Sequence, residues 1–339
     1  MTKLLNTAFA LGCIVVASAQ VYAWCPGYNP NNGTQKDARG VLWTPEPFVV
    51  YNNPAANDPL FASIHKTRLA SSESVIGLEY GGRAWCFPLR LMSSHRIANV
   101  DVGGEVMTVT YSPMSNSSVL YRPNFIEGSG TRKGKTLLEY AGNYGGGMVF
   151  DVNTQCGTRY QTKFSSYSQL NPSMVNPANT TGRSLKLGPP VVVTNYAAWR
   201  ARHPSTAVMQ PDPAAAPDKY DAYDLAPEGY VKNQLRDRTM VASDTRLPRE
   251  AEVFGVAIGQ DAAAFTIELL RREGGAMATL GSEAVTVLWD NELDTPYVFY
   301  PPEGIIATRS YWDAWSSHYP KVPLNETGSR AAVTEWAIY

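Results

Sequence analysis

The feature that most constrains this chain is an internal repeat, in which similar residues recur at one spacing. Val75–Leu78 returns as Val253–Val256, an offset of 178 residues. The same offset relates Ala84 to Ala262, Phe87 to Phe265, Leu91 to Leu269, Glu105 to Glu283, Thr108 to Thr286, Val109 to Val287, Tyr111 to Trp289 and Pro123 to Pro301. Because self-similarity at a fixed period indicates repeated supersecondary units, the sequence predicts two copies of one fold.

A further match near the end of each copy has a shorter offset of 116 residues. It relates Trp199–Pro204 (WRARHP) to Trp315–Pro320 (WSSHYP). The difference between the two offsets predicts about 60 extra residues in the middle of the first copy. The predicted divisions are a first repeat with its insertion at 40–205, a connection at 206–250, a second repeat at 251–325 and a tail at 326–339.

Both copies contain β-branched or alternating apolar runs separated by glycine-rich turns, a pattern typical of short strands. The predicted strands are 75–80, 84–89, 106–111, 119–122, 253–258, 262–267, 284–289 and 297–300, with an edge strand at 331–338. Short helices are predicted at 195–203 and 310–319, with Thr194 or Asn195, and Ser310, as N-caps. Abundant Tyr, Gly and Pro with only 17% charged residues also favour strands and turns. The predicted fold class is mainly β (α+β), with two related β-rich repeats and short helices packed into one compact unit.

The first residues have the pattern of a bacterial signal peptide at 1–19. Lys3 supplies a positive charge, Leu4–Val16 is apolar apart from two residues, and small residues precede a cleavage site after Ala19. Cleavage after Ala23 is the alternative. The apolar run is shorter than the roughly 20 residues that a membrane-spanning helix needs. The sequence therefore predicts an exported protein, periplasmic or secreted, without stable membrane insertion after cleavage.

The charge balance limits the classes of partner. The formal net charge is −1, so no basic field attracts nucleic acid or anionic lipid. The partners that remain are an unknown small molecule, a glycan or a protein.

Signal cleavage would leave three cysteines, Cys25, Cys86 and Cys156. An exported protein lies in an oxidising compartment, where cysteines pair, and an odd number leaves one thiol over. Cys86 lies in an apolar, strand-like run, which favours a buried and inert thiol. The candidate disulfide is therefore Cys25–Cys156, between residues in polar, glycine-bearing contexts.

One polar cluster is a candidate ligand-binding rim. His95, Asn99 and Asp101 precede a predicted strand. Tyr111 ends that strand, and Ser112, Ser115 and Asn116 follow it, so both groups flank the same pair of strands. In a catalytic interpretation, His95 is a base and Ser112 or Ser115 a nucleophile, with Asn116 near an oxyanion. The alternative is a loop whose polar side chains cap turns by bonding their own backbone.

Metal and aromatic sites are further alternatives. The four histidines, His65, His95, His203 and His318, lack the i, i+4 spacing that supports zinc, so no metal or other cofactor is predicted. Packing or C-terminal capping accounts for His203 and His318 in their helices. Tyrosines in loop-like regions either form an aromatic binding surface or cover sheet edges: Tyr140, Tyr144, Tyr160, Tyr167, Tyr220, Tyr223 and Tyr230.

Several of these runs together resemble the DUF 3179 family, a domain of unknown function found in exported prokaryotic proteins. They are Val75–Leu91, His95–Asp101, Gly103–Gly104, Val109–Ser115, Trp199–Pro204 and the 220–230 stretch leading to Arg246–Pro248, and the likeness covers roughly 44–323. The resemblance implies a Cys-Pro-Leu-Cys-Gly-like run after the Val-x-Tyr strand. Here Ser112 and Ser115 replace both thiols, and serine oxygens are poor ligands for soft metals.

These observations lead to two hypotheses about function. The first is an exported, non-enzymatic ligand-binding or scaffold protein that contacts its ligand through the His95–Asn116 rim. The second is a metal- or redox-related or hydrolytic enzyme that uses His95 and Ser112 at the same rim. A ligand-binding protein would tolerate His95→Ala without any chemistry to lose, whereas an enzyme would lose turnover.

Overall fold

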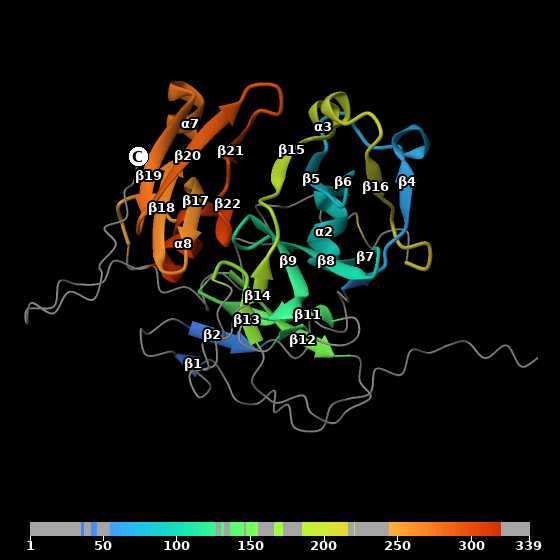
Figure 1. Cartoon of the computed structure of the whole chain (residues 1–339), viewed down its shortest axis with the longest axis horizontal. Helices are drawn as coiled ribbons and strands as arrows, with labels where there is room; N and C mark the ends of the chain where they lie inside the picture. Colours follow the sequence, from blue (N-terminus) through green and yellow to red (C-terminus); the bar gives the residue numbers. More distant parts are fainter. Residues whose placement is uncertain are drawn as a thin grey trace, which may run out of the picture.

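The computed structural model of the chain describes residues 35–36, 42–45, 55–126, 130–131, 136–145, 147–154, 166–171, 185–215, 220 and 244–319. Within them the protein is mainly β with short helices, which confirms the predicted fold class (Figure 1). The strands form five sheets. Two belong to a first lobe (55–131 and 185–215, within the described residues) and two to a second lobe (251–319). The fifth, the cover sheet, contains strands at 35–45 and 136–168.

The first lobe combines two sheets and two helices. One sheet contains, in spatial order, Val192–Asn195 (β15), Ser74–Tyr80 (β5), Arg83–Pro88 (β6), Ala207–Met209 (β16) and Phe61–Ser63 (β4). The other contains Gly130–Thr131 (β10), Ser117–Ile126 (β9), Glu105–Ser112 (β8), Ile97–Val102 (β7) and Ala56–Asn57 (β3), with Leu185–Leu187 (β14) beside β9. The helical elements are Ile64–Lys66 (η1, a 3-10 turn), Leu89–His95 (α2) and Tyr196–Arg202 (α3).

The second lobe is simpler, with two three-stranded sheets. The first contains Asp261–Thr266 (β18), Glu252–Ile258 (β17) and Ile305–Tyr311 (β22). The second contains Gly275–Leu280 (β19), Glu283–Asp290 (β20) and Thr295–Phe299 (β21). Its helices are Ile267–Glu273 (α7) and Trp312–His318 (α8).

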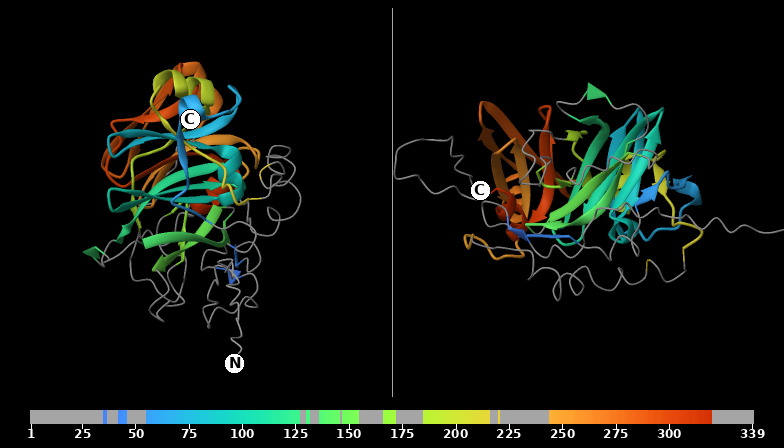
Figure 2. Two further views of the ribbon diagram at one scale, coloured as in Figure 1. Left: turned by 90° about the vertical axis from the view of Figure 1, so that its right-hand side faces the viewer. Right: turned by 90° about the horizontal axis from the view of Figure 1, so that it is seen from below.

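Six elements of the first lobe have counterparts at matching offsets in the second lobe. The elements β5, β6, α2, β7 and β8 each have a counterpart of equal length that begins 178 residues later, and α3 and α8 begin 116 residues apart. Registers correspond as well, because Asn195 lies opposite Ser74 and Tyr311 lies opposite Glu252. Seen from below, the strands of the two lobes stand side by side (Figure 2). The two offsets in the sequence are therefore also the offsets between elements of structure.

A tryptophan packed on a glycine attaches the last helix of each lobe to its sheet. Trp199 of α3 lies on Gly77 of β5, and Trp315 of α8 lies on Gly255 of β17. A Cβ atom at Gly77 would lie 2.3 Å from the Trp199 ring, and one at Gly255 would lie 2.5 Å from the Trp315 ring. Any side chain at these positions would displace the ring, so the close packing requires glycine.

The cover sheet lies over one face of the first lobe. Its strands are Gln35–Lys36 (β1), Leu42–Pro45 (β2), Thr136–Tyr144 (β11), Gly147–Thr154 (β12) and Ser166–Ser168 (β13). In Figure 1, β11, β12 and β13 lie beneath β7, β8 and β9. Strand β11 packs against all three of those strands. The insertion predicted from the change of offset thus supplies a layer that the second lobe lacks among the described residues.

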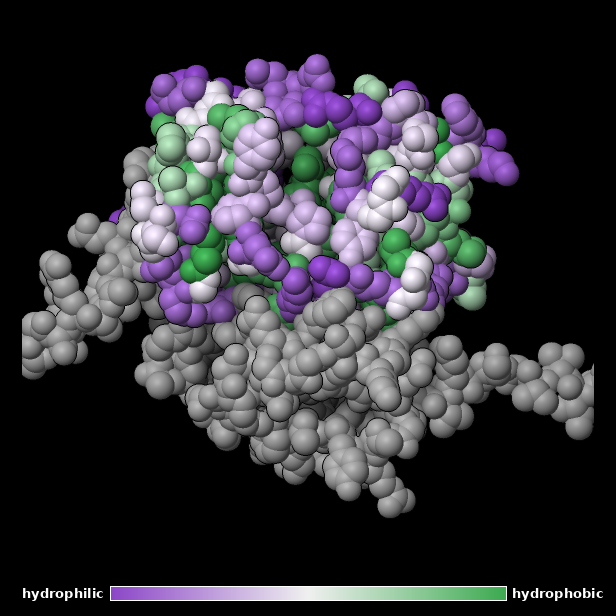
Figure 3. Space-filling view, viewed as in Figure 1, coloured by the Kyte–Doolittle hydropathy of each residue, from purple (hydrophilic) through white to green (hydrophobic). Residues whose placement is uncertain are grey.

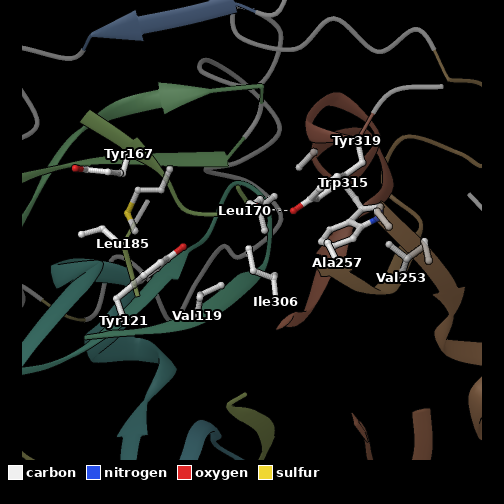
Figure 4. Close-up of a cluster of buried hydrophobic side chains, with 14 of the residues drawn as sticks. Val119, Tyr121, Tyr167, Leu170, Leu185, Val253, Ala257, Ile306, Trp315 and Tyr319 are labelled. Carbon is white, nitrogen blue, oxygen red and sulfur yellow. Dashed lines mark hydrogen bonds between the residues drawn. The ribbon is translucent and has the colours of Figure 1, made fainter. Parts of the chain in front are cut away.

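One buried apolar cluster connects both lobes and the cover sheet (Figure 4). Tyr121 of β9 lies on one side of it and Trp315 of α8 on the other. Between them, the Tyr319 hydroxyl donates a hydrogen bond of 2.6 Å to the backbone oxygen of Leu170. Separate apolar clusters fill the space between the two sheets of each lobe. Burial of this apolar area is the main favourable contribution to folding.

Several local predictions need correction. The sequence analysis did not predict α2 and α7, seven-residue helices that follow directly after β6 and β18. Asn195 is the N-cap of α3, as expected, because its side chain accepts a hydrogen bond from the Ala198 amide. The prediction of Ser310 as a cap was wrong, since α8 begins after Tyr311 and has no side-chain cap.

Other predictions fall outside the described residues. These are the signal peptide at 1–19, the Cys25–Cys156 disulfide, the tail at 326–339 and its edge strand at 331–338. Within the described residues, Cys86 is completely buried and unpaired, which confirms the expectation for this thiol. Burial, helped by the nearby Glu73 carboxylate, raises the pKa of the Cys86 thiol far above its ordinary value.

Candidate functional site

The predicted rim lies partly at one end of the β7–β8 pair. Helix α2 ends with Arg96 in the left-handed region at φ 62°, and this residue redirects the chain into β7. The backbone oxygen of Arg96 accepts a hydrogen bond of 2.7 Å from the amide of Tyr111. The end of α2, which carries His95, and the end of β8, which carries Ser112, therefore lie at the same edge of the sheet, as predicted.

The His95 side chain is not directed at the serines. It is buried, and its Nε2 atom lies 2.9 Å from the hydroxyl of Tyr220. Tyr220 comes from the connection between the lobes, and its hydroxyl also accepts a hydrogen bond from the Asp212 amide at 3.1 Å. Burial raises the pKa of Tyr220 above its ordinary value. His95 therefore helps to attach the connection to the first lobe.

Asn99 and Asp101 lie away from the turn that carries Ser112. Asn99 is 1% exposed, and its side chain bonds Asn57, Thr108 and both backbone groups of Leu138. It thereby connects the first lobe to β11 of the cover sheet. Asp101 lies at the opposite end of β7, where its carboxylate accepts a hydrogen bond from the Gly104 amide at 2.7 Å. The structure therefore separates these two residues from the predicted rim.

Ser112, Ser115 and Ser117 belong to a closed hydrogen-bond network at the turn between β8 and β9. All three are at most 2% exposed. The hydroxyls of Ser115 and Ser117 are 2.6 Å apart, and the Ser115 amide lies 3.4 Å from the Ser112 hydroxyl. Gln169 completes the network, because its Oε1 atom accepts a hydrogen bond from Ser117 Oγ at 2.9 Å, and its Nε2 atom donates to Thr110 Oγ1 and to the Ser117 carbonyl.

The same turn contacts the second lobe. The Asn116 amide group donates a hydrogen bond of 2.7 Å to Glu252, and the Tyr111 hydroxyl lies 3.3 Å from the Asn116 side-chain oxygen. The amide of Tyr311 donates to the Ser115 carbonyl at 2.8 Å. Burial, with smaller effects of Tyr311 and Glu252, raises the pKa of Tyr111. The turn therefore joins the two lobes at the start of α8.

The corresponding turn of the second lobe makes the reciprocal contact. Thr194, at the end of β15, donates a hydrogen bond to the Leu293 carbonyl, and Leu293 is the residue at the Ser115 offset. Arg202 pairs with Asp290 at 3.0 Å and with Glu292 at 2.6 Å. Burial would raise the pKa of Asp290, but the hydrogen bonds from Arg202 and from the Leu293 amide hold it below its ordinary value. In the face seen in Figure 3, the surface is hollowed between the two lobes.

A buried serine–histidine pair lies close to the network at the β8–β9 turn and was not predicted. Ser168 Oγ and His318 Nε2 are 2.8 Å apart, and both residues are at most 1% exposed. His318 Nδ1 lies 2.8 Å from the Ala314 carbonyl, which only accepts hydrogen bonds. Nδ1 therefore carries a hydrogen, and with that tautomer Nε2 accepts a hydrogen bond from the Ser168 hydroxyl. Gly147 leaves room for the ring, because a Cβ atom there would lie 2.8 Å from it.

Sequence reasoning missed Ser168, Gln169 and the pairing of His318. Ser168 and Gln169 lie in a polar stretch with no strand-like pattern, so only their contact with β8, β9 and α8 gives them significance. The expectation of C-terminal capping by His318 is confirmed by its bond to Ala314. Among the described residues, no three His, Cys, Asp or Glu side chains form a group that could hold a metal ion. No helix in the described part is long and apolar enough to cross a membrane.

Comparison with known proteins identifies one family. A family model described as a protein of unknown function (DUF3179) matches residues 52–303, well over half of the chain. The match covers the first lobe, the network at the β8–β9 turn and the second lobe as far as β21, and it ends before β22 and α8. No curated protein and no solved structure matches this chain.

Proposed function

This chain belongs to the DUF3179 family, and from that premise we propose that it is an exported, non-enzymatic binding or scaffold protein. One observation carries the proposal. Ser112, Ser115, Ser117 and Gln169 are at most 2% exposed, and their hydrogen bonds go to one another, to the adjacent backbone or to the buried Thr110 hydroxyl. A nucleophile or a ligand contact needs an approachable atom. Closed in this way, the network serves as a joint that holds the two lobes and the cover sheet together.

Ligand binding by the predicted rim residues stays a prediction. Asp101 and Asn116 are the two members of that set with partly exposed side chains, and they lie at opposite ends of the β7–β8 hairpin. A single small ligand cannot contact both residues across about 20 Å of strand. A binding role is therefore better served by an extended surface than by one small rim.

Export is tested by the intact mass of the protein from a Gram-negative host that expresses the full chain. We expect a periplasmic species that begins at Gln20, or at Trp24 if the second cleavage site is used. Metal analysis of the same sample, purified without added metal, is expected to find no stoichiometric ion. A full-length chain retained in the cytoplasm would refute export. Stoichiometric copper, zinc or iron that is lost in His95→Ala would refute the cofactor-free function.

A hydrolytic function is the second candidate, because the Ser168–His318 distance of 2.8 Å is that of a nucleophile and its base. The test is labelling with a fluorophosphonate, which modifies activated serines. We expect no labelling of the native protein, because both side chains are buried. Labelling at Ser168 that is lost in His318→Ala, while the fold is retained, would replace the binding proposal with a hydrolase. Ser168→Ala identifies the labelled residue.

A further inference from the structure

We propose that the outer face of the β19–β20–β21 sheet binds a second copy of this chain, face to face. The first observation is a contrast between corresponding faces of the two lobes. In the first lobe, the outer face of β7–β8–β9 is covered by the cover sheet, where Asn99 bonds Leu138 and Tyr121 packs with Tyr140. In the second lobe, none of the described residues covers the equivalent face.

The exposed fractions of side chains at equivalent positions show how differently the two faces are covered. Asn99 is 1% exposed, whereas Met277, which lies at the same offset, is 60% exposed. Tyr121 is completely buried, whereas its equivalent Phe299 is 46% exposed. The described residues contain four exposed large hydrophobic side chains, and three of them, Met277, Phe299 and Tyr300, lie on this face or at its end. Isolated exposed apolar residues are ordinary, but a contiguous group of them indicates an interaction site.

The exposed side chains are contiguous because the strand register aligns them. Met277 lies opposite Thr286, and Thr286 lies opposite Phe299, which gives one row across the three strands. Leu288 and Tyr297 form part of the adjacent row, and both are half-buried. Residues on one face of a sheet alternate with those on the other, so the side chains between them, such as Val287, point into the lobe core.

Tyr300 extends the surface beyond the strand end. It is 82% exposed and adopts φ 47°, the left-handed region that a bulky side chain rarely occupies. Its ring lies edge-on to Phe299, with the ring centroids 4.3 Å apart. An exposed aromatic pair held by an unfavourable backbone conformation indicates a place where the chain retains strain for a function.

The charge pattern favours a second copy as the occupant. The outward positions of the three strands between Gly275 and Phe299 carry one charged side chain, Asp290 at the end of β20, and Arg202 of the first lobe pairs with it. The other outward positions are uncharged: Gly275, Met277, Thr279, Ala284, Thr286, Leu288, Thr295, Tyr297 and Phe299. Two such faces can meet across a two-fold axis without burying an unpaired charge. The first lobe shows that a face of this kind can bind another sheet, because the apolar side of the cover sheet lies on its β7–β8–β9 face. Packed sheets of this kind lie about 10 Å apart.

The size of the face predicts a weak dimer. Three strands of about six residues present roughly 300 Å² in plan, and Tyr300 and the flanking turns add to this area. A stable complex needs about 800 Å² from each partner. We therefore expect reversible association in the micromolar range or weaker. The inference deepens the scaffold role proposed above, but self-association is a property of the folded chain whether or not the chain is exported.

The test is sedimentation equilibrium of the mature chain over a wide concentration range, for the wild type, Met277→Glu, Met277→Lys and the control Leu60→Glu. Leu60 is 59% exposed but lies on the first lobe, so it matches the loss of apolar surface at a different place. We expect the wild type and the control to dimerise alike and each Met277 variant to dissociate at least about tenfold more readily, because a two-fold interface brings like charges together. An equimolar mixture of Met277→Glu and Met277→Lys should restore association.

Three outcomes would overturn the proposal. The wild type could stay monomeric at every concentration, or Met277→Glu could associate as well as Leu60→Glu does. The chain could also associate only after residues 320–339 are removed, which would identify the tail as the cover of this face. Melting temperatures close to that of the wild type would show that the variants are folded, since all the substituted positions are exposed.

Discussion

Replacing Gln169 with leucine tests the buried joint directly. Gln169 is completely buried, and its side chain takes part in three hydrogen bonds at 2.9, 3.0 and 3.1 Å. In Gln169→Leu, the Ser117 hydroxyl keeps its contact with Ser115, and Thr110 still donates to the Val119 carbonyl at 2.9 Å. The Ser117 carbonyl loses the Gln169 amide, and Ser117 remains opposite Ser112 in the β8–β9 ladder.

The expected cost follows from those bonds. Each of the three lost bonds costs about 0.5–1.5 kcal/mol. The apolar leucine offsets part of this loss, which leaves a decrease of about 1–3 kcal/mol in the free energy of unfolding. The melting temperature should fall by several degrees, since about 1 kcal/mol corresponds to roughly 2–4 °C in a chain of this size class.

The assay is urea unfolding, followed by tryptophan fluorescence, with Gln210→Leu as the matched control. Gln210 donates two hydrogen bonds, to Thr67 and to the Val208 carbonyl, but its side chain is only half-buried, so water can replace them. The control should lose less than about 1 kcal/mol. If Gln169→Leu were within about 0.5 kcal/mol of the wild type, the network would not be a joint of the kind described here.

The remaining predictions concern close packing, burial and charge. Gly255→Ala should lower the free energy of unfolding by about 3 kcal/mol or prevent folding, because its Cβ atom would lie 2.5 Å from the buried Trp315 ring; thermal melting measures this loss. Cys86 should resist alkylation until denaturant is added, as judged by peptide mass spectrometry, because burial raises the pKa of the thiol. The Arg122 hydrogen bond lowers the pKa of Glu105 in the folded state, so its stabilising contribution should be complete above about pH 4.3 and disappear as the pH falls through the folded pKa. Unfolding of the wild type and Glu105→Gln across that range should show their difference narrowing in acid, and a constant difference would contradict the pairing.

The extent of successful prediction differs between elements. The strands β5 and β17 were predicted to within a residue, because an apolar run bounded by glycine turns is a local signal. The helices α2 and α7 were missed, because seven residues are too few for a helical period to stand out. Helices of that length are marginal alone, and here they depend on packing against the strands of their own lobe.

In the candidate site, too, local features were predicted and features that depend on tertiary packing were not. The sequence identified the polar turn at Ser112–Asn116 and the shared sheet edge with His95, because antiparallel neighbours bring those chain ends together. It did not identify burial of the serines, which depends on Gln169 in a distant segment. Nor did it distinguish a hydroxyl that faces solvent from one that faces another layer, because the residue type is the same in both cases.

The sequence by itself indicated the order of the main strands and the two offsets, of 178 and 116 residues, at which similar elements recur. Local side-chain patterns specify these features, and such patterns are present in the chain before it folds. Only the tertiary structure decided which sheet faces are covered. The same position in the two copies is Asn99, buried beneath the cover sheet, and Met277, exposed to solvent. That difference depends on long-range contacts of the insertion, and no local pattern around either residue encodes them.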